Sequence, residues 1–83
     1  MEYNINVEKF RKQYNKEYDF LYNNHDNVAG YSEAVNAFDN LMKTSESFVN
    51  FVREYVINVR HCDPISSDRE CAAFMFALDV LAE

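Results

Sequence analysis

Residues 62–81, CDPISSDRECAAFMFALDVL, decide how this chain folds. The proline and the serines predict a turn at the start of this stretch. Ser67 and Glu70 then have the spacing of a capping box, in which each side chain accepts a hydrogen bond from the backbone N–H of the other residue. The stretch therefore predicts a loop that leads into a helix over residues 68–81.

This predicted helix is apolar on two faces. The first face carries apolar residues at helical spacing, namely Cys71, Phe74, Met75, Leu78 and Ala82. Phe76 and Val80, flanked by Ala72 and Ala73, form a second face roughly opposite. A helix that is apolar all round is usually covered on both sides. Two interpretations stay open for the second face: singly exposed apolar residues, which are common, or a ridge that binds a partner.

Three more helices are expected before this segment, over residues 7–23, 32–43 and 46–60, each with an apolar stripe at helical spacing. Asn6 is a suitable N-cap for the first, and Thr44 or Ser45 for the third. Residues 55–59 are β-branched enough for a strand, but no other segment offers a pairing partner. With one Gly and one Pro in 83 residues, the sequence predicts an all-α, single-domain bundle of about four helices spanning residues 1–83.

Charge limits the classes of partner. The net charge is −6, and the charges are unevenly spread: residues 1–16 hold four basic and two acidic side chains, whereas residues 17–83 hold four basic and twelve acidic ones. Binding to a nucleic-acid backbone relies on Lys and Arg, so direct nucleic-acid binding is not expected. An acidic chain of this kind could instead mimic nucleic acid as a decoy that inhibits a host nuclease or transcription factor.

The residues that could carry chemistry do not form a recognisable site. His61, Cys62 and Asp63 are consecutive, whereas catalytic triads are assembled in space from separate segments. Structural zinc sites take four ligands, and the other histidine, His25, lies in a distant predicted loop. The sequence predicts no catalytic, cofactor-binding or metal-binding residues and no enzyme. Cys62 and Cys71 are expected to be thiols, with a disulfide between them as the open alternative.

The location can also be predicted. Residues 1–6, MEYNIN, lack the basic and apolar regions of a signal peptide. The longest apolar run, from Cys71 to Leu78, is far shorter than the roughly twenty residues of a spanning helix. A cytoplasmic protein without a membrane span is expected.

The segment Asp63-Pro64, Ser66-Ser67-Asp68, Glu70-Cys71, placed before a helix, resembles the corresponding stretch of the lysis-inhibition antiholins of T-even phages. The family has exported and cytoplasmic members, and this chain is more similar in character to the cytoplasmic ones. The resemblance implies a regulator that binds the soluble cytoplasmic part of a phage holin and delays lysis. Another antiholin, or a second copy of this chain bound through the helix over residues 68–81, would be a further candidate partner.

Four apolar residues are predicted to bind this partner, because they lie off the main apolar stripes or on the second face of the last helix. They are Phe20, Ile57, Phe76 and Val80.

Overall fold

The computed structural model describes residues 5–24 and 27–81 and contains four helices. They are α1 (Val7–Asn24), α2 (Tyr31–Thr44), α3 (Glu46–Asn58) and α4 (Asp68–Leu81). In these two ranges the chain forms no strand, so the prediction of a small all-α bundle is confirmed. The predicted helix bounds differ from the observed ones by no more than two residues, and those of α4 are the same. His25 and Ala82 lie outside the described residues.

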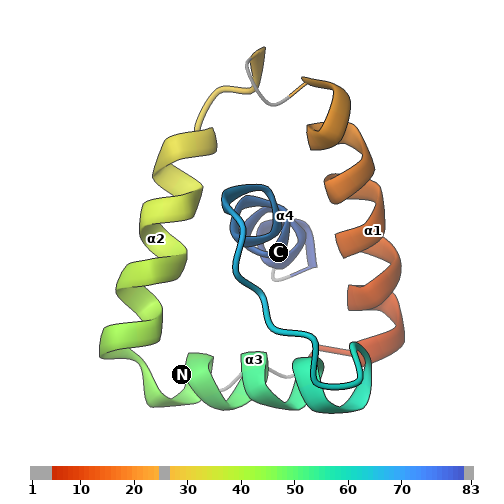
Figure 1. The fold of residues 1–83 in the computed structure, drawn as a ribbon, viewed down its shortest axis with the longest axis vertical. Helices are drawn as coiled ribbons and strands as arrows, with labels where there is room; N and C mark the ends of the chain where they lie inside the picture. Colours follow the sequence, from red (N-terminus) through yellow and green to blue (C-terminus); the bar gives the residue numbers. More distant parts are fainter. Residues whose placement is uncertain (1–4, 25–26, 82–83) are drawn as a thin grey trace.

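The first three helices surround the fourth. Figure 1 shows α1 and α2 on opposite sides of the molecule and α3 across one end, so that together they form three sides of a frame. The helix α4 is seen end-on in the middle of this frame and packs against both α1 and α2. The last helix of the sequence is therefore the central helix of the fold.

Phe74 of α4 is the point where all three frame helices meet. Its side chain is fully buried. Six rings lie with their centroids 4.7 to 6.4 Å from the Phe74 centroid: Phe10, Tyr14, Phe38, Phe48, Phe51 and Tyr55. Most of these pairs meet edge to face, the arrangement that aromatic quadrupoles favour. Aromatic contacts therefore connect α4 to every side of the frame.

The central position of α4 explains why it is apolar on more than one face. Ala72, Ala73 and Ala77 are fully buried, as is Phe74. Small side chains allow neighbouring helices to approach α4 closely, and a helix enclosed on all sides has no need of a polar face. The fold itself thus covers the alanines that flank Phe76 and Val80 in the sequence.

Side chains predicted to cap helices do so. The Asn6 side chain accepts a hydrogen bond of 3.1 Å from the backbone N–H of Lys9, at the start of α1. Ser45 accepts one of 3.3 Å from the N–H of Phe48, at the start of α3. Before α2 the chain passes through Gly30, whose φ of 83° lies in the left-handed region that favours glycine.

The end of α3 differs from the prediction, because the helix stops at Asn58 and not at Arg60. The backbone N–H of Cys62 donates to the carbonyl of Val56 over 2.9 Å, and the N–H of Arg60 donates to the carbonyl of Tyr55 over 3.3 Å. His61 and Cys62 have left-handed φ values of 52° and 72°. These residues turn the chain out of α3 and free the Arg60 side chain to reach the loop beyond.

Candidate functional site

The four residues predicted to bind a partner come from three helices. Phe20 on α1, Ile57 on α3 and Val80 on α4 are 54%, 52% and 50% exposed. Phe76 is half-buried and packs against the core. Phe76 and Val80 are four residues apart and therefore lie on one face of α4. We refer to Phe20, Ile57, Phe76 and Val80 as the apolar surface set.

Tyr22 is another exposed aromatic residue, but it has a partner within the chain. The guanidinium carbon of Arg69 lies 4.7 Å from the centroid of the Tyr22 ring and 5.8 Å from that of Tyr18. A guanidinium group is attracted to the face of an aromatic ring. This contact attaches the start of α4 to α1, so Tyr22 is not included in the apolar surface set.

The loop between α3 and α4 is organised by Arg60. Its Nε donates to the carbonyl of Asp63 over 2.9 Å, and its Nη1 donates to the Tyr14 hydroxyl over 3.2 Å. Its Nη2 contacts the Asp63 carboxylate at 3.2 Å and also pairs with Glu70. A single guanidinium group thus connects α1, the loop and the first turn of α4. We refer to Tyr14, Arg60, Asp63 and Glu70 as the Arg60 cluster.

Glu70 completes this arrangement through the predicted capping box. The Ser67 backbone N–H donates to Glu70 Oε1 over 3.0 Å, and the Glu70 N–H donates to Ser67 Oγ over 3.2 Å. Burial by itself would raise the pKa of Glu70, but hydrogen bonds from Ser67 and Arg60 outweigh it, so this pKa is lowered. The segment that carries the family resemblance therefore holds the loop against α4.

Sequence reasoning missed the role of Arg60, which it placed at the end of a helix. Burial would lower the pKa of Arg60, but the neighbouring Tyr14, Glu70 and Asp63 reverse this effect and raise it. Two local signals point to the cluster: an Arg shortly before a turn, and a capping-box Glu with a second carboxylate oxygen to satisfy. The contact between Arg60 and Tyr14, however, joins residues 46 positions apart, and no local pattern reveals it.

The two cysteines differ in their surroundings. Both cysteines are free thiols, Cys62 exposed and Cys71 buried. Burial, together with the carboxylates of Asp39, Asp68 and Glu70, raises the pKa of Cys71 to about 11, so this thiol is protonated at neutral pH. The thiolate is the nucleophilic form. Across residues 5–24 and 27–81, no group of three or more His, Cys, Asp and Glu side chains is placed to hold a metal ion.

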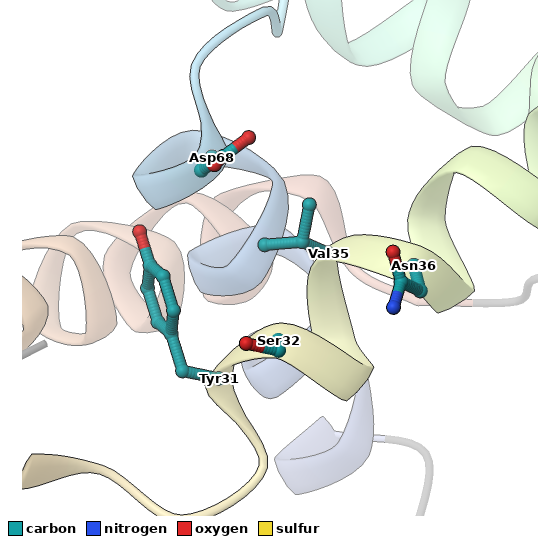
Figure 2. A pocket seen from close by; sticks show the side chains of 5 residues that line it. All are labelled: Tyr31, Ser32, Val35, Asn36 and Asp68. Atoms are coloured by element: carbon teal, nitrogen blue, oxygen red, sulfur yellow. The ribbon is translucent and has the colours of Figure 1, made fainter. Parts of the chain in front are cut away.

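The surface has shallow cavities close to α4. A cavity of about 250 Å³ is lined by Tyr14, Asn15, Tyr18, Arg60 and Glu70. Another, of about 270 Å³, is lined by Tyr31, Ser32, Val35, Asn36 and Asp68 (Figure 2). Both fall below the range of about 300–1,000 Å³ that is usual for small-molecule and cofactor sites.

Comparison with known proteins gives no further guide, because the chain matches no family model, no curated protein and no solved structure. Within the described ranges, the model contains no helix with the length and apolar character needed to span a bilayer.

Proposed function

We propose that this protein is a regulator that acts by binding another protein, and more specifically a cytoplasmic antiholin of the phage lysis-inhibition type. The observation that carries the proposal is the exposure of Phe20, Ile57 and Val80, each at least half exposed on a chain of only 83 residues. Large exposed apolar side chains are typical of protein–protein contact sites when they form one continuous patch. The antiholin identity is supported by the resemblance in residues 63–71.

The proposed mechanism is sequestration of the holin. The apolar surface set would cover the apolar face of an amphipathic helix at the cytoplasmic end of the holin, which is a common mode of peptide recognition. A holin whose cytoplasmic segment is occupied assembles less readily into the pore that triggers lysis. The Arg60 cluster would contribute indirectly, because it fixes α4 and with it the positions of Phe76 and Val80.

Co-purification with a tagged cytoplasmic segment of a phage holin tests this proposal. The wild-type chain should bind at micromolar concentration, and replacing Phe20 or Val80 by Ser should weaken the binding. Met42→Ser is the matched control, because Met42 is also exposed and apolar but lies on α2, outside the apolar surface set. Absence of binding at micromolar concentration, or lysis timing that expression of the chain leaves unchanged, would rule the antiholin function out.

Self-association is tested alongside by sedimentation. A wild-type dimer that becomes a monomer in Val80→Asp would show that a second copy of this chain occupies the surface, and not a holin. A wild-type monomer that binds the holin segment supports the proposed function.

The alternative function, an acidic decoy that mimics nucleic acid, needs carboxylates in one continuous strip. In the described residues, acidic side chains are distributed over all four helices. Three of the carboxylates, those of Glu8, Asp63 and Glu70, are paired with arginines of the same chain. These observations favour the apolar surface set over the acidic groups as the partner-binding feature.

A further inference from the structure

The cavity between the starts of α2 and α4 has a composition that selects its occupant. Figure 2 shows Tyr31 and Ser32 in the first turn of α2, Val35 and Asn36 about one turn further on, and Asp68 facing them from α4. Its volume of about 270 Å³ is small for a cofactor. We call it the Asp68 cavity.

The walls of the Asp68 cavity combine apolar and polar surface. Tyr31 and Val35 are half-buried and pack against the core, and they offer a ring and a branched side chain. Ser32 and Asn36 add a hydroxyl and an amide at the exposed side. A long side chain with an apolar stem and a polar tip matches such walls, because the stem packs on the apolar part while the tip keeps polar contacts.

The charge of the cavity comes from the carboxylate of Asp68, in the first turn of α4. Asp63 and Glu70, the acidic neighbours of Asp68 in the sequence, both pair with Arg60. Across the described part of the chain, Asp68 is joined to no basic side chain, and it is exposed. The Asp68 carboxylate therefore gives the cavity a negatively charged wall that can pair with a cation.

From this geometry we propose that the Asp68 cavity receives a Lys or Arg side chain of the protein partner. The methylene groups of that side chain would pack on Tyr31 and Val35, and its charged end would meet the Asp68 carboxylate. The tyrosine ring would add a favourable contact, since aromatic faces attract cations. The inference rests on the proposed function for one point, namely that the side chain belongs to a protein.

The inference can be tested without knowing the partner. N-acetyl-lysine amide and N-acetyl-arginine amide, added separately to the isotope-labelled full chain, should shift the NMR signals of the Ser32, Asn36 and Asp68 backbone amides. N-acetyl-norleucine amide has a similar apolar stem without the charge, and at equal ionic strength it should leave these signals unchanged. No shift with the two cationic probes, or equal shifts with the norleucine probe, would overturn the inference.

Three variants test whether binding requires the charge of Asp68. Asp68→Asn should raise the dissociation constant of the lysine probe about two- to fivefold, as expected for an exposed ion pair. Asp79→Asn makes the same change at the other end of α4 and should leave binding unaltered. Asn36→Lys places a competing ammonium group at the cavity and should also weaken binding. Equal affinities for wild type and Asp68→Asn would contradict the inference, provided that both chains unfold at the same urea concentration.

The same variants separate this inference from the proposed function. If the cationic probes bind but the holin segment does not, the cavity inference stands and the antiholin function fails. If the holin segment binds and neither probe does, the antiholin function stands and the cavity inference fails.

Discussion

The two halves of α4 both contain a run of apolar residues but lie in different surroundings. In the first half every residue from Cys71 to Phe74 is buried, because the frame helices enclose it on all sides. In the second half Ala77 and Leu78 are buried, whereas Asp79 and Val80 are exposed and Phe76 is half-buried. The apolar character of the helix thus has two causes. In the first half it builds the core, and in the second it leaves Val80 and part of Phe76 exposed.

The largest expected effect comes from the centre of the first half. Phe74→Ala should lower the free energy of unfolding by about 3–5 kcal/mol, because it removes a fully buried ring and leaves a cavity. Phe76→Ala, in the second half, should cost clearly less, since its side chain is only half-buried. Urea unfolding measures both. Equal losses would contradict the distinction between the two halves.

The second-largest effect on stability is expected where the first half of α4 contacts the loop between α3 and α4. Arg60→Met should cost about 1–3 kcal/mol, because it leaves the mostly buried Glu70 carboxylate without its charged partner. Arg53→Met is the control: Arg53 is exposed on α3, and its replacement should change stability by less than about 0.5 kcal/mol. Urea unfolding of the two variants gives the comparison, and similar values would show that the cluster does not stabilise the fold.

Acid should weaken the same attachment. The pKa of Glu70 is lowered in the folded chain relative to its ordinary value of 4.5. Its stabilising contribution is therefore fully present above pH 4.5 and is lost as the pH falls through the lowered pKa. Thermal unfolding of wild type and Glu70→Gln as a function of pH should show curves that converge in acid. A constant difference between them down to pH 2, near the lower end of acid denaturation, would contradict this role of Glu70.

A smaller effect of opposite sign is expected in the turn before α4. His61→Gly should raise the free energy of unfolding by about 0.5–1 kcal/mol, because glycine adopts the left-handed φ without the strain of a side chain, an advantage only partly offset by chain entropy. Glu54→Gly, inside α3, should instead lower it by about 1 kcal/mol. Thermal unfolding measures both. A loss of stability in His61→Gly would show that the His61 side chain has contacts that matter.

The smallest effect on stability belongs to the exposed end of α4. Val80→Ser should change the free energy of unfolding by less than about 0.5 kcal/mol, because half of the side chain is already in water. Ala77→Ser, three residues earlier, should cost about 1–3 kcal/mol, since it places a hydroxyl in a fully buried position. Urea unfolding distinguishes them, and a large loss in Val80→Ser would place Val80 in the core.

Local patterns in the sequence were sufficient to predict the helices. Each apolar stripe has the helical period, and the capping box of Ser67 and Glu70 sets the start of α4 at the observed residue. The predicted end of α3 was wrong because the apolar period continues to Val59, whereas the left-handed turn at His61 and Cys62 follows a helix that ends at Asn58. Glycine usually marks a left-handed turn in a sequence. His61 and Cys62 form this turn without glycine, so no residue pattern indicates it.

The position of α4 in the fold could not be predicted in the same way. A helix that is apolar on two faces can be enclosed by its own chain or by a partner, and only the arrangement of α1, α2 and α3 decides between them. Phe20, Ile57 and Val80 lie off the predicted stripes and are exposed, whereas Phe76 is partly covered. The Asp68 cavity and the Arg60 cluster each join segments that are distant in the sequence, so neither could be found from spacing.

The measurement that tests the central claim most directly is the affinity of the holin cytoplasmic segment for wild type and for Val80→Ser, determined by calorimetry. Wild type should bind the segment at micromolar concentration, and Val80→Ser should bind it clearly more weakly at an unchanged urea midpoint. Equal affinities for the two chains, with Met42→Ser as the control, would contradict the claim that the exposed end of α4 binds the partner.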